Sequence, residues 1–397
     1  MNTNEHFFAP CPRGLETLLA EDIRQAGAPS ASVRVVPGGV EFQGDRRVCY
    51  GVNLESRIAS RVLWRVAAGH YQREEDIYRL AMDVDWPALF AVRRKFRVYV
   101  TAIHSPLRSL EFITLRVKDA VCDRFRAACG ERPSIDTAQP DVRIHLFLTA
   151  DQATLYLDTS GEPLWQRGHK IAKVEAPVKE NLAAGILRLI GWRPGIPLYD
   201  PMCGSGSFLL EAAQLSLGDA PGLSREPGVF GFEKLRGFDR TLWQQLGRDV
   251  AERRTLAPAT LAIHGADISA DAAARARQNL DYAGIGELVD VRVGDMLELA
   301  PPAGPPGIVI ANPPYGERLG EKEQLAAFYP LLGDALKKKY AGWDCWFLSA
   351  DTALPKRIGL SVKRKIPLYN GPLECRLYHF PMIAGSNRPH PKPADAG

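Results

Sequence analysis

The sequence predicts an α/β protein in which a doubly wound, mostly parallel sheet follows an α+β N-terminal half. Two observations carry this prediction. Beyond a polar segment at 158–163, the expected strands and helices alternate, which is typical of a parallel sheet that binds ligands at the carboxyl ends of its strands. Before that segment, short alternating apolar runs mix with amphipathic helical stretches, which favours an α+β arrangement.

Hydrophobic periodicity predicts the individual elements. In the N-terminal half it indicates a helix at 15–26, a strand-turn-strand at 33–42, a strand at 97–103, a helix at 112–126 and a hairpin over 142–157. Farther on it indicates helices at 178–190, 207–213 and 270–282 and strands at 197–199, 260–266, 289–293 and 307–311. Residues 221–256 fit no βα unit, so we interpret them as an insertion, and their role stays open.

Length and composition limit the class of protein. A chain of 397 residues is expected to form two or three domains, and 46% apolar with 24% charged residues is the balance of an ordinary globular protein. The N-terminus lacks a basic region leading into an apolar run, so we expect a cytoplasmic protein without a membrane partner. The seven cysteines form no Cys-x-x-Cys pair, which argues against a disulfide framework and a zinc site. We therefore expect no metal.

Charge is concentrated in two places, although the net charge is only +4. Residues 91–126 hold nine Lys and Arg against three acidic residues, and a second cluster runs from Lys356 to Lys365. Basic patches can attract the phosphates of a nucleic acid. A solvated helix face would look the same, so both interpretations stay open.

A glycine-rich turn joins the strand at 197–199 to the following helix. Asp200, Gly204 and Gly206 place an acid and two glycines there, and glycines let a ligand approach the backbone and the start of the helix closely. A dinucleotide fold usually carries a third glycine, Gly-x-Gly-x-x-Gly, and this turn lacks it. The turn therefore disfavours a pyrophosphate ligand.

Two further acids follow the next two strands. Asp267 comes after 261–266 and Asp295 after 291–294. An acid at the position of Asp267 can accept hydrogen bonds from ribose hydroxyls, and an acid at the position of Asp295 can accept one from an adenine amino group. Either acid alone could be a helix N-cap, but the ordered set with the glycine-rich turn favours an adenosine ligand.

The tetrad Asn312-Pro313-Pro314-Tyr315 follows the strand at 307–311. Two prolines fix the backbone and remove two N–H donors, which leaves carbonyls and the Asn amide oxygen as acceptors. Acceptors at the hydrogens of a base amine favour pyramidalisation of its nitrogen toward a methyl donor, and Tyr315 offers a face on which an extruded base could stack. The tetrad thus predicts amine methylation, with no metal or nucleophile required.

These motifs resemble those of bacterial THUMP-domain RNA methyltransferases. Residues 200–315 look like a class I methyltransferase with the amino-methylating signature, and further matching segments lie at 9–16, 115–120, 139–143, 158–161, 175–183 and 369–375. The similarity is strongest to the 23S rRNA guanine-N2 methyltransferase group. Some members carry a second methyltransferase domain at the C-terminus, and we expect no second activity from this chain.

The resemblance implies a seven-stranded, mostly parallel Rossmann-like methyltransferase domain at 161–385, preceded by a ferredoxin-like segment at 1–50 and a THUMP domain at 51–160, with a flexible tail at 386–397. It implies S-adenosylmethionine as the cofactor. Its implied ligands are Asp200, Met202, Gly204, Gly206, Asp267, Asp295 and Asn312. The implied catalytic residues are Asn312, Pro313, Pro314 and Tyr315, which would hold the guanine amine. The implied partner is structured RNA, either 23S rRNA or a pre-50S particle.

Alternatives remain at this point. The tetrad also serves adenine-N6 methylation of DNA and glutamine methylation of proteins, although the N-terminal half favours RNA over both. A tRNA guanine-N2 methyltransferase is the serious rival, because THUMP domains are also found on tRNA enzymes. From another class, the chain could be a non-catalytic RNA-binding assembly factor that retains a methyltransferase fold.

Overall fold

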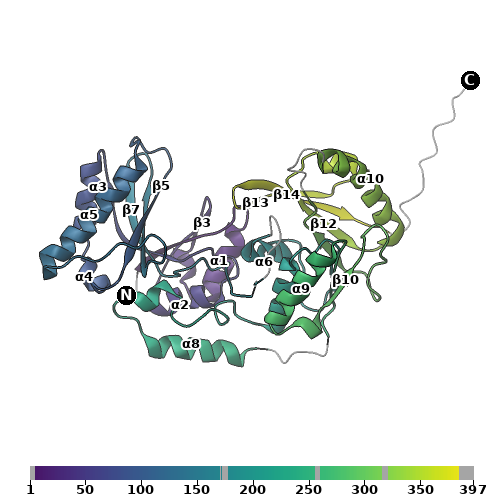
Figure 1. Ribbon diagram of the computed structural model, residues 1–397, viewed down its shortest axis with the longest axis horizontal. Helices are drawn as coiled ribbons and strands as arrows, with labels where there is room; N and C mark the ends of the chain where they lie inside the picture. Colours follow the sequence, from purple (N-terminus) through teal and green to yellow (C-terminus); the bar gives the residue numbers. More distant parts are fainter. Residues whose placement is uncertain (1–4, 170, 172–177, 255–259, 315–320, 384–397) are drawn as a thin grey trace, which may run out of the picture. The chain divides into compact units, whose positions relative to one another are not determined.

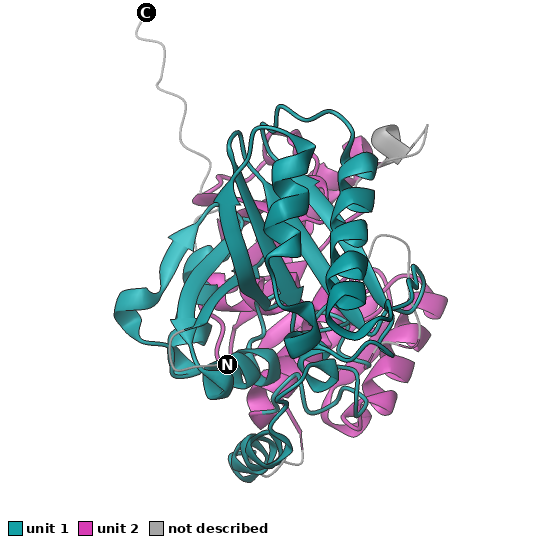
Figure 2. Ribbon diagram, turned by 90° about the vertical axis from the view of Figure 1, so that its left-hand side faces the viewer, with its two compact units in different colours: residues 1–168, 219–254 teal, residues 169–218, 255–397 magenta. Residues whose placement is uncertain are grey.

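The computed structural model describes residues 5–169, 171, 178–254, 260–314 and 321–383, with side chains omitted at 321–324. The chain forms two compact units (Figure 2). Unit 1 comprises residues 1–168 and 219–254, and unit 2 comprises residues 169–218 and 255–397. The chain therefore passes between the units three times.

Unit 1 is built on one seven-stranded sheet with the order β2-β3-β1-β4-β7-β6-β5. Its strands are β1 (Glu5–Pro10), β2 (Arg34–Val36), β3 (Gly39–Gly44), β4 (Leu63–His70), β5 (Phe96–Ala102), β6 (Val142–Leu148) and β7 (Gln152–Asp158). All neighbours are antiparallel except β5 and β6, which run parallel. The predicted strand-turn-strand and hairpin correspond to β2–β3 and β6–β7.

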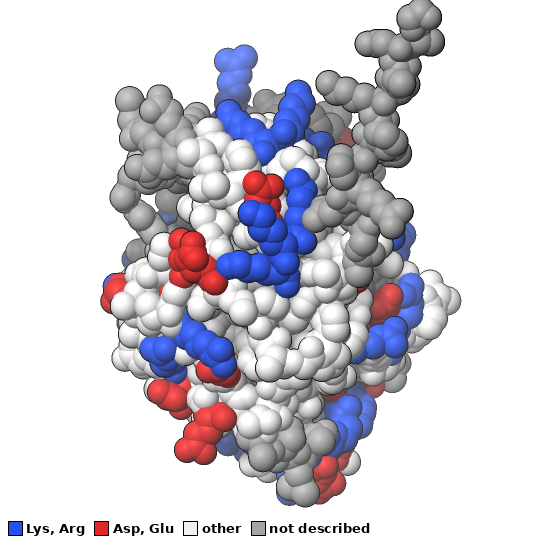
Figure 3. Space-filling view, turned by 90° about the vertical axis from the view of Figure 1, so that its right-hand side faces the viewer, with Lys and Arg blue, Asp and Glu red and all other residues white. Residues whose placement is uncertain are grey.

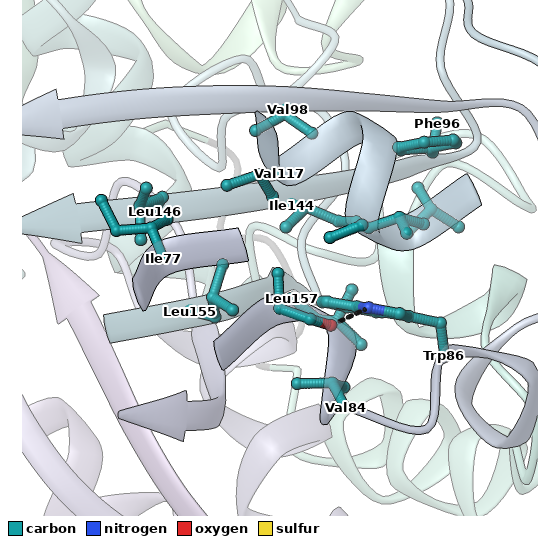
Figure 4. Close-up of a cluster of buried hydrophobic side chains, with 14 of the residues drawn as sticks. Ile77, Val84, Trp86, Phe96, Val98, Val117, Ile144, Leu146, Leu155 and Leu157 are labelled. Atoms are coloured by element: carbon teal, nitrogen blue, oxygen red, sulfur yellow. Dashed lines mark hydrogen bonds between the residues drawn. The ribbon is translucent and has the colours of Figure 1, made fainter. Parts of the chain in front are cut away.

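Helices cover the β4–β7 end of this sheet on one face. They are α3 (Glu74–Met82), α4 (Trp86–Leu89) and α5 (Leu110–Cys129), seen beside β5 and β7 in Figure 1. Along β6, buried and partly exposed residues alternate, as expected when one face of a strand meets a core. Figure 4 shows this core, in which Ile144, Leu155 and Val117 pack together and Trp86 donates its indole N–H to the carbonyl oxygen of Ala81 at 2.7 Å.

The remaining part of unit 1 joins the N-terminal helices to the insertion. α1 (Glu16–Gln25) and α2 (Arg46–Glu55) lie next to β3, and η1 (Ser30–Ser32) precedes β2. The insertion supplies η2 (Gly231–Lys234) and α8 (Arg240–Glu252), and α8 packs on α2. Residues 219–254 lie within the predicted methyltransferase range, but they pack in unit 1.

Aromatic side chains hold the insertion in place. The ring of Phe232 lies 4.3 Å from that of Tyr50 on α2 and 5.1 Å from that of Trp243 on α8. Gly222 donates its N–H to the carbonyl oxygen of Leu54 at 2.8 Å, and a Cβ at Gly222 would lie 2.7 Å from the Leu54 Cα. A glycine is thus required where the insertion meets α2.

Unit 2 contains the second seven-stranded sheet, with the order β10-β9-β8-β11-β12-β14-β13. Its strands are β8 (Leu198–Asp200), β9 (Ile263–Asp267), β10 (Asp290–Val293), β11 (Ile308–Ala311), β12 (Asp344–Ser349), β13 (Arg364–Asn370) and β14 (Leu373–Pro381). The first five strands in the order run parallel, and β14 is antiparallel to both β12 and β13. The predicted doubly wound, mostly parallel sheet is confirmed.

Helices flank this sheet. They are α6 (Glu180–Leu189), α7 (Ser207–Leu217), α9 (Ala270–Tyr282), α10 (Glu321–Lys339) and α11 (Leu354–Arg357), with η3 (Gly286–Leu288) before β10. A core of Tyr340, Trp343, Phe347 and Phe380 lies between α10 and the strands. Among the helices that the structure describes, none is long and apolar enough to cross a membrane.

Candidate active site

The glycine-rich turn after β8 bends sharply before α7. Gly204 and Gly206 adopt φ values of 54° and 81°, and Gly206 is the N-cap residue of α7. A side chain at such a φ is strained, so both positions favour glycine. Asp200 is buried at the end of β8, and its Oδ1 accepts the N–H of Met202 at 3.1 Å. The predicted turn residues therefore lie together at the carboxyl end of β8.

Asp267 ends β9, the neighbouring parallel strand. Its Oδ2 accepts the N–H of Gly204 at 2.9 Å, and its Oδ1 accepts the N–H of Ser269 at 2.9 Å. This carboxylate ties the start of α9 to the glycine-rich turn. The predicted partners from two separate motifs, 63 residues apart, are in direct contact.

Asp295 follows β10, the next strand in the sheet. Gly294, the residue before Asp295, donates its N–H to the carbonyl oxygen of Asp267 at 2.9 Å. This hydrogen bond brings Asp295 close to the carboxyl end of β9. The Oδ1 of Asp295 accepts the N–H of Leu297 at 2.9 Å. Asp200, Asp267 and Asp295 thus lie along one edge of the sheet, at the carboxyl ends of β8, β9 and β10.

The Asn312 tetrad begins directly after β11, on the other side of β8. Val309 pairs with Tyr199, so the register places Ile310 level with Asp200. Asn312 lies two residues farther along, roughly 7 Å beyond that level at the usual rise of a strand. Asn312 is half-buried, Pro313 is buried and Pro314 is exposed, whereas Tyr315 lies outside the described residues. The tetrad therefore starts at the same edge as the three acids.

Comparison with known families identifies the chain. A model described as "RMKL-like, methyltransferase domain" matches residues 167–379. The chain belongs to the RMKL-like methyltransferase family. Two more models match upstream, the RlmL ferredoxin-like domain at residues 6–63 and the THUMP domain at residues 71–158. In this order, the three matches make the protein a THUMP-containing, RlmL-like methyltransferase, and the resemblance seen in the sequence is confirmed.

Solved structures are similar over almost the whole chain. SMU.472, assigned as a methyltransferase and solved in complex with SAH, is 28% identical with a TM-score of 0.84, over 96% of this chain and 98% of that one. An assigned methylase from Clostridium difficile 630 is 28% identical with a TM-score of 0.86, over 97% and 100%. A predicted N6-adenine-specific DNA methylase from Listeria monocytogenes str. 4b F2365 is 27% identical with a TM-score of 0.84, over 95% of this chain and 96% of that one.

S-adenosylmethionine is the methyl donor of this RMKL-like methyltransferase, as the sequence predicted. The edge formed by β8, β9 and β10 fits that molecule. Three carboxylates repel a pyrophosphate but suit ribose hydroxyls, an amino group and a sulfonium cation. The positive φ of Gly204 and Gly206 favours glycine at both positions. Because glycine has no side chain, a ligand can approach the backbone of the turn closely. Among the described residues, no group of His, Cys, Asp or Glu could hold a metal ion.

One positioning residue of the methyltransferase unit escaped the sequence analysis. Asn279 on α9 is 0% exposed, and its side-chain N–H donates to the carbonyl oxygen of Ser205 at 3.0 Å. Its Oδ1 accepts the N–H of Ile171 at 3.1 Å. Asn279 thus connects α9 to the glycine-rich turn. The signal in the sequence is an Asn at a position where the helical period of Ala273 and Ala276 predicts an apolar residue.

The pKa of Asp200 is well above its usual value, because burial disfavours the charged carboxylate. The neighbouring Asp267 carboxylate raises this pKa further, whereas the hydrogen bond from Met202 lowers it. Between the usual carboxyl pKa and this raised value, the folded protein binds more protons than the unfolded chain. The ligand-free protein therefore loses stability as the pH rises through that window.

We expect Asp200→Asn to increase the free energy of unfolding of the ligand-free protein at pH 8 and to change it little near pH 4, because the amide carries no charge to bury. The affinity for S-adenosylmethionine should fall in the same variant. Urea denaturation at both pH values and calorimetry with the cofactor measure the two effects. Asp271→Asn, on an exposed side chain, is the control. Equal or lower stability of Asp200→Asn at pH 8 would contradict this account.

The basic stretch at 91–126 is largely paired within unit 1. Six of its nine basic side chains form ion pairs, namely Arg94 with Asp141, Lys95 with Asp136, Arg116 with Glu75, Lys118 with Asp119, Arg124 with Asp85 and Arg126 with Asp123. Four of these carboxylates come from outside the stretch. The local excess of positive charge read from the sequence is therefore offset by residues from other segments.

Proposed function

We propose that this protein transfers a methyl group from S-adenosylmethionine to the exocyclic N2 of a guanine in structured RNA, with 23S rRNA as the favoured substrate. The observation that carries the proposal is the start of the Asn312-Pro313-Pro314-Tyr315 tetrad at the edge where the cofactor residues meet. In this proposal Asp200, Met202, Gly204, Gly206, Asp267, Asp295 and Asn312 form the cofactor site.

The proposed roles in the tetrad follow from its chemistry. The sulfonium of S-adenosylmethionine supplies an electrophilic methyl group. The Asn312 amide oxygen accepts a hydrogen bond from the guanine amine, which favours pyramidalisation of its nitrogen. Pro313 is buried and anchors the turn, and Pro313 and Pro314 together restrict its backbone. Tyr315, which lies outside the described part of the chain, would stack on the extruded base.

RNA as the acceptor is supported by the domains that precede the methyltransferase range. A ferredoxin-like domain and a THUMP domain together occupy most of unit 1. The Listeria relative is described as a predicted N6-adenine-specific DNA methylase, and N6-adenine in DNA is the alternative acceptor for the same tetrad. A guanine-N2 in tRNA is the alternative within RNA.

Identification of the methylated nucleoside tests the proposal. Purified protein is incubated with labelled S-adenosylmethionine in three parallel reactions, which contain unmodified 23S rRNA, a tRNA pool or duplex DNA. Each product is then digested to nucleosides and analysed by mass spectrometry. We expect N2-methylguanosine from 23S rRNA, at a higher yield than from tRNA. N6-methyladenine as the product, or transfer to DNA alone, would refute the proposal.

A further inference from the structure

We infer that a second basic cluster, on unit 2, binds the phosphate backbone of the RNA substrate at a distance from the reacting nucleotide. This inference rests on the proposed function. We call the cluster the C-terminal basic surface, and its members are Lys337, Lys338, Lys339, Lys356, Arg357, Lys363, Arg364 and Lys365. Figure 3 shows Lys and Arg side chains gathered on this side of the molecule, with acidic side chains among and beside them.

Three separate segments supply these side chains. The last turn of α10 provides Lys337–Lys339, α11 provides Lys356 and Arg357, and Lys363 with the first two residues of β13 provides the third group. Lysines at the C-terminus of a helix are ordinary, because they offset its partial negative charge. That explanation does not apply to Lys363–Lys365, which do not lie at the end of a helix. The fold thus gathers cations that local structure does not require.

Most of these cations have no acidic neighbour, unlike those of the 91–126 stretch. Lys337 lies 3.6 Å from Asp334, and the ammonium group of Lys339 donates to the carbonyl oxygens of Leu297 and Glu298 at 2.6 and 2.8 Å. Within the described residues, the other six make no ion pair with a carboxylate, and all six are exposed. Their charge remains available to an anionic partner.

Arg364 shows how the surface is held in shape. Its guanidinium lies over the ring of Trp346 at 5.5 Å, and that ring stacks on His379 at 4.0 Å. Lys363 donates its backbone N–H to the carbonyl oxygen of His379 at 2.9 Å. The start of β13 is thus fixed against β14, so its cations are presented from a regular element. Such preorganisation lowers the entropic cost of binding.

A hollow of about 570 Å³ opens within this surface. Lys337 and Lys363 line it, together with the apolar side chains of Leu360, Val362 and Met382. Cations at the wall and apolar groups between them suit a ribose-phosphate chain, which has charged oxygens on one side and carbon atoms on the other. A flat lysine-rich helix face would lack this shape.

The strand registers place this surface toward the edge of the sheet opposite the proposed reaction site. β13 is the third strand from β11, after β12 and β14, and its first residue, Arg364, lies level with Ile310 through the paired registers. Lys337–Lys339 end the helix that leads into the start of β12, whereas Asn312 follows the carboxyl end of β11. Cations at that edge would contact phosphates of the RNA at a distance from the target guanine. We therefore expect the surface to hold the RNA without touching the reacting base, and to determine RNA affinity rather than the rate of the chemical step.

The test compares two triple variants of the full-length protein. Lys356, Lys363 and Lys365 are replaced by alanine in the first. The control replaces three other exposed residues by alanine, namely Arg24, Arg193 and Arg248, and so removes the same number of positive charges. Binding of a fluorescent 30-nucleotide RNA hairpin is measured between about 50 and 200 mM salt. We expect the first variant to lose affinity roughly tenfold or more and the slope of log K against log salt to flatten by about two, with the control near wild type.

The methylation readout separates this inference from the proposed function. At saturating 23S rRNA, the single-turnover rate of the first variant should equal that of the wild type. Unchanged affinity and slope in the first variant would overturn the inference, even if the wild type produces N2-methylguanosine. Equal losses in both variants would also overturn it, because only net charge would then matter. Conversely, loss of hairpin affinity in the first variant alone, with N6-methyladenine as the product, would support the surface and refute the proposed function.

Discussion

Replacing Asn312 by alanine is expected to lower kcat by about 10²- to 10³-fold, the cost typical of removing one preorganised polar group from an active site. The variant removes the acceptor that we propose for the guanine amine. Asn312 follows a fully buried strand, and Pro313 is buried beside it, so the fold should tolerate the truncation. Turnover is measured with labelled S-adenosylmethionine and 23S rRNA.

Two controls make this result specific to Asn312. Calorimetry with S-adenosylmethionine should give nearly wild-type affinity for Asn312→Ala, since Asp267 and Asp295 carry most of the proposed cofactor contacts. Asn312→Asp retains an acceptor oxygen and should keep more activity than the alanine variant. Wild-type turnover by Asn312→Ala would refute the catalytic role of Asn312.

Phe232→Ala should reduce the free energy of unfolding of unit 1 by about 3–5 kcal/mol, because it removes a large buried ring and leaves a cavity. Phe232 is 1% exposed and lies between Tyr50 and Trp243. The loss would show that the insertion, although it follows α7 in the chain, is part of the N-terminal core. Urea denaturation monitored by tryptophan fluorescence measures the change.

The matched control for this prediction is Phe112→Ala, on an exposed face of α5 in the same unit. Phe112 is 49% exposed, so its removal should change the free energy of unfolding by less than about 0.5 kcal/mol. A loss below about 1 kcal/mol for Phe232→Ala would mean that the insertion contributes little to the stability of unit 1.

The sequence predicted the elements of unit 2 between residues 178 and 311 well because their signals are local, whereas the helices and strands after residue 320 were not predicted individually. The helix expected at 270–282 is α9 with the same bounds, the strand expected at 197–199 is shifted by one residue from β8, and the strand expected at 307–311 begins one residue before β11. The turn glycines and the acids at strand ends are also local signals, because their roles depend on the backbone next to them in the chain. Gly204 and Asp267 could therefore be assigned to one site before their hydrogen bond was seen.

Features that depend on distant contacts could not be predicted. The aromatic side chains of the insertion gave no indication of their partner, because Tyr50 lies about 180 residues earlier. The ion pairs of the 91–126 stretch were hidden for the same reason, since Glu75, Asp136 and Asp141 come from other segments. The cluster at 356–365 was the smaller signal in the sequence, yet its exposed cations stay unpaired among the described residues.

The proposal as a whole is tested most directly by mapping modified nucleosides in rRNA and tRNA from cells that lack this protein. If it is a guanine-N2 methyltransferase of 23S rRNA, mass spectrometry should show that one N2-methylguanosine disappears from 23S rRNA and returns when the wild-type protein is restored, but not when Asn312→Ala is. An unchanged set of N2-methylguanosines in 23S rRNA, with a methylated nucleoside lost from tRNA or DNA instead, would contradict the proposal.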